Sequence, residues 1–360
     1  MDFIKPEGIR ISMFELLITE SCNQKCSYCF DNYFAERISG HDPSTYMHVE
    51  MLPDIMSFID RVKDPNEKIE IHYIGGEPMV NREFFVESVK VLKDRYYPNI
   101  NFSINTNLVI LDDELLDVFT DNNFCFTVSL DGARESHNLH RMNWDKIMAN
   151  LVKLNARFVD KYGPNHRRIS VNDVISCDTV DAIEEDCKFL YDLHIPVSLG
   201  MNNEDNWNDE LFARYKEKVL AVSRKYGIKN NHFASMGIVR LNNGQKHFCL
   251  QESTNVTINP QGKLFFCHRL TPKSYKMGDD FKYFYGDIWN GYTTDYYKLI
   301  SDITSQRRMK EKCKTCDILN YCNTGCIACH YYVNDDYDSV SENSCKTMHI
   351  WHDITMELLK

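Results

Sequence analysis

The sequence lacks the features that would place a chain in a membrane or export it. No window approaches about 18 uninterrupted apolar residues, and the start, MDFIKPEGIRISMFELL, has no basic stretch leading into an apolar run. Basic residues are also outnumbered, because 41 Lys and Arg face 52 Asp and Glu, and the net charge of −11 would repel a phosphate backbone. These absences predict a cytoplasmic protein with no membrane and no nucleic-acid partner.

Internal repeats, low-complexity tracts and long linkers rich in proline, glycine or serine are absent as well. A compact chain is therefore expected. With 360 residues, of which 43% are hydrophobic, it is long enough for one large α/β core and a smaller domain of about 100 residues.

Apolar runs rich in strand-forming residues alternate with amphipathic stretches from residue 10 to about residue 200, which is the pattern of parallel βαβ units. The predicted strands are residues 14–19, 69–74, 101–106, 124–130, 169–175 and 196–201. The predicted helices are residues 48–63, 82–95, 113–121, 145–160, 179–193 and 206–227. Six such units predict an α/β fold with a partial, TIM-like (β/α)6 barrel at residues 1–235, followed by a small cysteine-rich domain at residues 236–360.

Four short motifs each follow a predicted strand: SCNQKCSYC, GGEP, NTN and SLDG, in that order. In barrels of this kind the chemistry gathers at the carboxyl ends of the strands. The four motifs are therefore candidates for one functional site.

Fourteen cysteines are present, and without a secretion signal they indicate metal ligands or catalytic groups rather than disulfides. Cys22, Cys26 and Cys29 have the spacing C-x3-C-x2-C in the loop after the first predicted strand. Three thiolates can hold three irons of a four-iron cluster and leave the fourth iron with an open position. A structural zinc ion or a ferredoxin-like cluster is the alternative, but both normally close their coordination with four protein ligands.

This spacing, with an aromatic residue before the last cysteine (Cys-Ser-Tyr-Cys), resembles the signature of the radical S-adenosylmethionine superfamily. The resemblance implies that the open iron binds the amino and carboxylate groups of S-adenosylmethionine. It also implies that an electron from the cluster splits this molecule into methionine and a 5′-deoxyadenosyl radical, which abstracts hydrogen from a substrate. The protein would hold the cofactor and keep water and oxygen away.

The other barrel motifs fit the same resemblance. In the family's GGEP motif, matched here by residues 75–78, the absent side chains would let backbone groups approach the methionyl amine of the cofactor. Short polar groups near the ends of the third and fourth strands would contact its ribose or carboxylate, and an arginine would pair with that carboxylate. The predicted cofactor-binding residues are Tyr28, Gly75, Gly76, Glu77, Pro78, Asn105, Ser129, Asp131 and Arg141.

Seven cysteines near the C-terminus match the SPASM domain, an extension of some radical S-adenosylmethionine enzymes that carries two auxiliary four-iron clusters. The family pattern assigns the first auxiliary cluster to Cys249, Cys267 and Cys326, and the second to Cys313, Cys316, Cys322 and Cys345. Three 4Fe-4S clusters are therefore expected in all. The fourth position of the first auxiliary cluster is either open or filled by His247, Cys329 or another group.

SPASM relatives mostly act on peptides or proteins, so the resemblance implies an oxidoreductase with a peptide or protein substrate. The main hypothesis is a maturase that forms a crosslink in a ribosomally synthesised peptide. The alternative is an anaerobic sulfatase-maturating enzyme that forms formylglycine; in that family an aspartate follows the equivalent of Cys267, where this chain has His268. An imidazole can accept a proton near neutral pH, so the predicted catalytic residues are Cys22, Cys26, Cys29 and His268. A remote alternative is a non-catalytic iron–sulfur or zinc scaffold.

Two partners besides the substrate follow from this hypothesis. The radical chemistry needs an electron donor such as flavodoxin or ferredoxin. The chain begins almost at its first predicted strand, so it is expected to lack its own leader-recognition domain. A separate leader-peptide recognition protein, or the edge of the barrel, would then hold the peptide.

Overall fold

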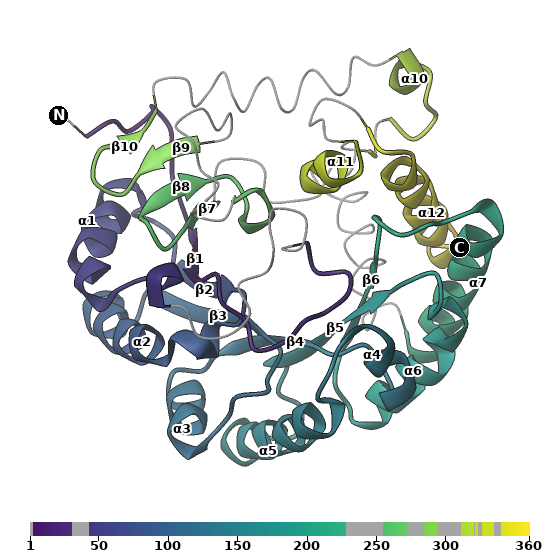
Figure 1. Ribbon diagram of the computed structural model, residues 1–360, viewed down its shortest axis with the longest axis horizontal. Helices are drawn as coiled ribbons and strands as arrows, with labels where there is room; N and C mark the ends of the chain where they lie inside the picture. The colour runs from purple at the N-terminus through teal and green to yellow at the C-terminus, as the bar shows by residue number, and fades with distance from the viewer. Residues whose placement is uncertain are drawn as a thin grey trace. The chain divides into compact units, whose positions relative to one another are not determined.

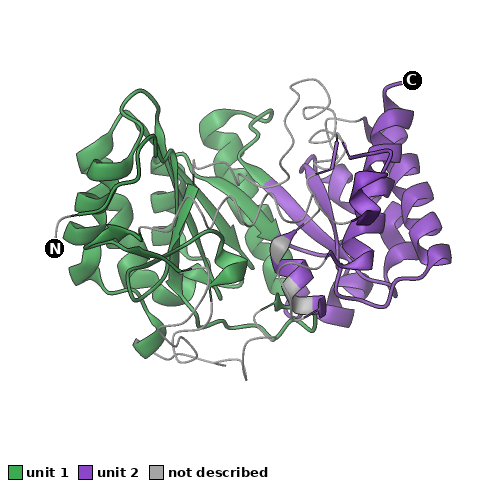
Figure 2. Cartoon of the chain, turned by 90° about the horizontal axis from the view of Figure 1, so that it is seen from above, with its two compact units in different colours: residues 1–128, 145–169, 250–299 green, residues 129–144, 170–249, 300–360 purple. Residues whose placement is uncertain are grey.

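The computed structural model describes residues 3–30, 43–227, 255–271, 284–293, 311–319, 321–322, 326–334 and 340–360. Figure 1 labels the helices and strands, and Figure 2 colours two compact units. Unit 1 contains residues 1–128, 145–169 and 250–299, and unit 2 contains residues 129–144, 170–249 and 300–360. The domain boundary near residue 235 stays a prediction.

Unit 1 is built on a mixed sheet. In the order in which they are hydrogen-bonded, its strands are β10 (Gly291–Tyr292), β9 (Phe284–Asp287), β8 (Lys263–Phe265), β7 (Asn255–Ile258), β1 (Met13–Thr19), β2 (Ile69–Gly75), β3 (Ile100–Thr106) and β4 (Cys125–Ser129). Strands β7, β1, β2, β3 and β4 are parallel, whereas β8, β9 and β10 continue the sheet in antiparallel fashion. The segment after residue 250 thus extends the sheet through a parallel pairing of β7 with β1.

The helices of unit 1 cover one face of its sheet (Figure 1). They are α1 (Leu52–Val62), α2 (Arg82–Tyr96), α3 (Asp113–Asp121) and α5 (Trp144–Tyr162). Strand β1 presents Phe14, Leu16 and Ile18, all fully buried, on alternate positions, so one face of this central strand packs into the apolar core. The opposite face of β1 carries Glu15, Leu17 and Thr19, and the polar groups of the strand, on Glu15 and Thr19, are therefore on this face.

Unit 2 contains a parallel strand pair and the remaining helices. Its elements are β5 (Ile169–Ile175), β6 (Val197–Met201), α4 (Arg134–His140), α6 (Ile183–Asp192), α7 (Asp209–Tyr226), α10 (Glu311–Lys314), α11 (Ile327–Asn334) and α12 (Glu342–Leu358). Helix α7 packs against α6 and α12. The side chains of Asn208 and Ser341 accept hydrogen bonds from backbone N–H groups in the first turns of α7 and α12, which explains where these two helices begin. Short 3-10 helices in the two units are η2 (Pro43–Thr45), η3 (Val49–Met51), η4 (Pro78–Asn81), η5 (Val180–Ala182) and η7 (His268–Leu270).

The six predicted strands and six predicted helices are confirmed, with ends that differ by a few residues at most. Helix α4 was not predicted, because its sequence RESHNLH has no apolar periodicity. None of the helices in the described part of the chain combines the length and apolar character needed to cross a bilayer.

Candidate functional site

The first cysteine motif occupies a buried loop that leaves the end of β1. The side chains of Cys22 and Cys26 are 6% and 7% exposed, and Cys29 is partly buried. Gln24 lies between the first two: its backbone N–H donates to Cys22 Sγ (3.5 Å), and its Oε1 lies 3.7 Å from Cys26 Sγ. The N–H of Cys29 donates to the carbonyl of Cys26 (3.2 Å), so a tight turn closes the loop. Tyr28, in this turn, is partly buried.

The two glycines of GGEP lie directly against the backbone that leads into this loop. Gly76 N–H donates to Thr19 O and Glu77 N–H to Ser21 O, both at 2.9 Å. A Cβ on Gly76 would lie 2.3 Å from Ser21 O, and a Cβ on Gly75 would lie 2.3 Å from Thr19 O. Both positions therefore require glycine, because the atoms that a side chain would strike belong to the main chain.

Glu77 connects the GGEP turn to the end of β3. Its buried carboxylate accepts hydrogen bonds from Thr106 Oγ1 (2.7 Å), Asn107 N (2.7 Å) and Met79 N (3.2 Å). Burial raises its pKa to about 7, against the opposing effect of these donors. The following residue, Pro78, is buried and begins η4. The observed contacts of Glu77 thus position the turn beside the cysteine loop.

Asn107 is a neighbour of the cysteine loop that the sequence analysis missed. Its Nδ2 donates to Asn23 Oδ1 (2.7 Å) and lies 3.9 Å from Cys22 Sγ. Asn105, the predicted residue, is within β3 and pairs in register with Thr127 of β4. Both asparagines belong to the motif NTN, but Asn107 lies one residue beyond the end of β3. The second asparagine is the one in contact with the loop, and the cofactor contact of Asn105 stays a prediction.

In unit 2, the SLDG motif and Arg141 are bonded to one another. The buried carboxylate of Asp131 accepts from Arg141 Nε (3.0 Å) and from Val174 N (3.1 Å). Ser129 is the last residue of β4. These contacts attach the turn after β4 to β5. The cofactor contacts of Ser129, Asp131 and Arg141 stay predictions.

His268 begins η7 and reaches a carboxylate inside β1. Its Nδ1 lies 3.4 Å from Glu15 Oε1, and Thr257 Oγ1 donates to Glu15 Oε2 (2.5 Å). Burial by itself would raise the pKa of Glu15, but His268, His72 and Thr257 together hold it at about 2. Glu15 was not predicted, although an acidic residue within the apolar strand MFELLIT is an unusual feature that marks it.

Glu15 belongs to a polar row that crosses neighbouring strands at one level. Thr257 and His72 flank it in the sheet register, and Ser103 follows His72. Ser103 Oγ donates to Glu70, so it must accept from Nδ1–H of His72 at 2.8 Å. Burial lowers the pKa of His72. When the His72 ring is neutral, this bond keeps its proton on Nδ1 and leaves Nε2 as an acceptor.

The low pKa of Glu15 makes the stability of the folded protein depend on pH. In the folded protein this carboxylate stays ionised down to a pH of about 2, whereas the unfolded chain takes up the proton near 4.5. Its stabilising effect is present above pH 4.5 and is lost as the pH falls from 4.5 towards 2; the difference is equivalent to roughly 3 kcal/mol. Glu15→Gln should therefore flatten the dependence of the unfolding free energy on pH between 5 and 3, measured by urea denaturation. Replacement of the exposed Glu83 by Gln is the control and should leave the slope unchanged.

A small pocket joins these features within unit 1. Its walls include Leu17 and Phe30, the glycines Gly75 and Gly76, and His268. The rings of Phe30 and His268 are 5.9 Å apart between centroids. The pocket therefore brings the GGEP glycines, the residue after Cys29 and the imidazole together. Three cysteines in one loop, beside a pocket lined by two glycines, fit an iron–sulfur cluster with a small cofactor next to it.

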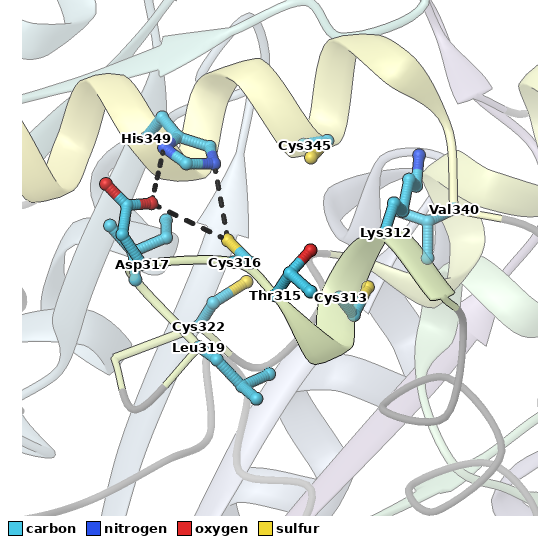
Figure 3. Close-up of a pocket in the computed structure, with 11 residues that line it drawn as sticks. Lys312, Cys313, Thr315, Cys316, Asp317, Leu319, Cys322, Val340, Cys345 and His349 are labelled. Atoms are coloured by element: carbon cyan, nitrogen blue, oxygen red, sulfur yellow. Dashed lines mark hydrogen bonds and ion pairs between the residues drawn. The ribbon is translucent and has the colours of Figure 1, made fainter.

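A separate cavity, lined by cysteines, lies in unit 2 and has a volume of about 280 Å³. Figure 3 shows Cys313, Cys316, Cys322 and Cys345 around it. A tetrahedral zinc ion, with bonds of about 2.3 Å, would bring its sulfur ligands to within about 4 Å of one another. Among the described residues, no three cysteine sulfurs lie within 4.8 Å of one another. The wider spacing of the four cysteine sulfurs fits a cluster better than a zinc ion held by these cysteines, while ligand atoms of Cys316, Asp317 and His349 lie within 4.8 Å of one another.

The predicted ligands of the first auxiliary cluster are only partly described. Cys249 lies outside the described residues. Cys267, just before η7, belongs to unit 1, and Cys326, just before α11, belongs to unit 2. Both are partly buried. Their assignment to one cluster stays a prediction.

Comparisons with known proteins agree with this geometry. The profile of the radical SAM superfamily matches residues 16–190, and that of the SPASM iron–sulfur cluster-binding domain matches residues 249–317. A cysteine-type anaerobic sulfatase-maturating enzyme of Clostridium novyi (strain NT) is 23% identical over 343 residues, which cover 88% of this chain and 87% of that protein. The radical SAM cyclopropyl synthase TigE of Paramaledivibacter caminithermalis is 23% identical over 283 residues, 72% of this chain and 58% of that protein.

A solved structure, native anSMEcpe with bound AdoMet, has the same fold, with a TM-score of 0.75, 16% sequence identity, and coverage of 97% of this chain and 98% of that one. This likeness confirms the predicted partial barrel followed by a SPASM domain. S-adenosylmethionine and 4Fe-4S clusters are the cofactors that these two domains imply. The cysteine loop after β1, the GGEP turn against it and both profile matches lead to one conclusion: the chain belongs to the radical SAM superfamily and carries a SPASM domain.

Proposed function

We propose that this protein is an oxidoreductase that modifies a ribosomally synthesised peptide in the cytoplasm, using S-adenosylmethionine and three 4Fe-4S clusters. The observation that carries the proposal is the pocket in which His268 and the GGEP glycines meet beside the first cysteine loop. In this proposal residues 1–235 form the barrel and residues 236–360 the SPASM domain.

The residues of the pocket have separate tasks. When bound, the cluster and S-adenosylmethionine would supply the electron and the hydrogen abstraction. Cys22, Cys26 and Cys29 would hold the cluster. Gly75 and Gly76 pack against the backbone that leads into the cysteine loop, and both line the pocket in which the cofactor would lie. The apolar side chains of the wall, such as Leu17 and Phe30, would keep water away.

His268 would accept the proton that leaves the peptide. Removal of two hydrogens from a substrate would transfer one as a hydrogen atom to the 5′-deoxyadenosyl radical and release the other as a proton and one electron. The imidazole, which lines the same pocket as the glycines, would take the proton, and an oxidised C-terminal 4Fe-4S cluster would take the electron. Glu15, 3.4 Å away and anionic, would orient the ring. Glu15 would thus act through His268, without contacting the substrate itself.

Maturation of a sulfatase is the second candidate. Two observations favour it: the relative from Clostridium novyi carries that name and is matched over 87% of its length, and the solved structure with the same fold includes a form with bound AdoMet and the Cp18Cys peptide. The imidazole at position 268 would then take the place of the aspartate of that family. The two candidates differ in substrate and share the same pocket.

Mass spectrometry distinguishes the candidates. Anaerobically reconstituted enzyme, with S-adenosylmethionine and a strong reductant, is incubated with the peptide encoded beside its gene or with a Cys- or Ser-containing peptide from a sulfatase. We expect the first peptide to lose two hydrogens per modification and the second to stay unchanged. Formylglycine in the second peptide would replace the proposal by sulfatase maturation. His268→Gln is the companion variant and should still form 5′-deoxyadenosine but little modified peptide.

A further inference from the structure

Helix α12 presents an imidazole as well as a thiol to the cavity in unit 2. Cys345 and His349 are four residues apart on this helix, so they share one face. Figure 3 shows His349 pointing to Cys316, and the distance from its Nε2 to Cys316 Sγ is 3.6 Å. This contact joins two segments that are 33 residues apart in the sequence.

Asp317 completes a chain of three polar groups. Its Oδ1 lies 3.9 Å from His349 Nδ1 and 3.9 Å from Cys316 Sγ. The imidazole thus has a carboxylate beside one nitrogen and a thiol beside the other. At 3.9 Å the carboxylate is beyond hydrogen-bond distance of Nδ1, so the closer contact of the ring is that of Nε2 with Cys316 Sγ.

The remaining groups of the cavity show why His349 is not needed as a ligand. Four cysteines line it, and four thiolates complete the protein ligands of a 4Fe-4S cluster. Cys316 would be one of them. A metal-bound thiolate carries no hydrogen, so in the loaded site the contact with His349 is a hydrogen bond in which Nε2–H donates and the sulfur accepts.

We propose that His349 donates a hydrogen bond to the thiolate of Cys316 and thereby raises the reduction potential of the iron–sulfur site in unit 2. Reduction adds negative charge to the cluster and its sulfurs, so an N–H donor stabilises the reduced form more than the oxidised form. Apolar side chains of the cavity wall, including the buried Ile318, strengthen the bond by limiting water on that side. The inference rests on the proposed cluster ligands Cys313, Cys316, Cys322 and Cys345.

The reduction potential of the site tests this proposal. Full-length protein with Cys22, Cys26 and Cys29 replaced by alanine is reconstituted anaerobically, so that only the C-terminal clusters contribute, and is titrated with EPR detection. The transition that Cys316→Ala removes belongs to the site in unit 2. His349→Phe should make this site about tenfold harder to reduce, which is about 59 mV for a one-electron couple, with unchanged iron content. His349→Gln, which keeps an N–H donor, should restore part of the shift.

Other results of these measurements would contradict either the hydrogen bond from His349 or the cluster itself. A potential that is the same in His349→Phe, with full iron content, would overturn the hydrogen bond. Loss of iron in His349→Phe would also overturn it, because the imidazole would then be a ligand. His48→Phe, at an exposed position in unit 1, is the matched control and should change neither quantity. If Cys316→Ala removed no iron and no transition, the proposed cluster itself would fail, independently of His349.

Discussion

Replacement of Cys26 by alanine should abolish reductive cleavage of S-adenosylmethionine. Cys26 is buried in the loop after β1, and two thiolates would remain where three are needed to hold the cluster. Formation of 5′-deoxyadenosine by anaerobically reconstituted protein with a strong reductant should fall to the level seen without enzyme. Iron content should fall by the amount of one four-iron cluster, because the C-terminal sites keep their ligands.

A matched cysteine variant separates loss of the cluster from a general effect of thiol removal. Cys125 is exposed at the start of β4 and belongs to no cysteine motif. Cys125→Ala should therefore keep both the iron content and the formation of 5′-deoxyadenosine. If Cys26→Ala retained cleavage, or if iron at this loop had a fourth protein ligand, the proposed activity would be wrong.

The βα units of the barrel were predictable because each carries its own local signal. Strand β5 was predicted with both of its ends correct, and α3 likewise, since apolar periodicity marks the elements and Asp112 caps the helix. Helix α4 carries no such signal: it is short and polar, and its position depends on the bonds that hold the turn after β4. Local sequence pattern therefore predicted the strands and helices of the barrel but missed α4, whose position depends on tertiary contacts.

The residues of the candidate site also fall into two groups, those that the sequence predicted and those that it did not. Cysteine spacing and the GGEP motif could be recognised from the sequence because their residues are close together in it. Glu15 and His268 are 253 residues apart, and only the pairing of β7 with β1 brings their segments together. The contact of Asn107 with the cysteine loop was not predicted, because the choice between the two asparagines of one motif depends on where the strand ends. Contacts of this kind follow from register and cannot be read from spacing.

The GGEP turn shows how the packing of main chain on main chain supports the chemistry. The sequence analysis assigned its glycines to the approach of a cofactor. The structure adds a second requirement, because Gly75 and Gly76 lie against the carbonyl groups of Thr19 and Ser21. The same backbone continues directly into Cys22. The geometry of the cysteine loop is therefore coupled to the absence of two Cβ atoms on the neighbouring strand.

This coupling predicts that Gly76→Ala destabilises the protein by about 3 kcal/mol or more and disturbs the first cluster. The new Cβ would lie 2.3 Å from Ser21 O and 2.6 Å from Ser21 C, and main-chain atoms held by backbone hydrogen bonds cannot move aside as a flexible side chain can. Urea denaturation would measure the stability, and iron content with 5′-deoxyadenosine formation would measure the cluster.

Gly200→Ala in β6 is the control, because its Cβ would meet nothing closer than 3.6 Å. That variant should be as stable as the parent or more stable by up to about 1 kcal/mol, since alanine restricts the unfolded chain more than glycine does. Equal stability and iron content in the two variants would show that the GGEP turn does not support the cysteine loop.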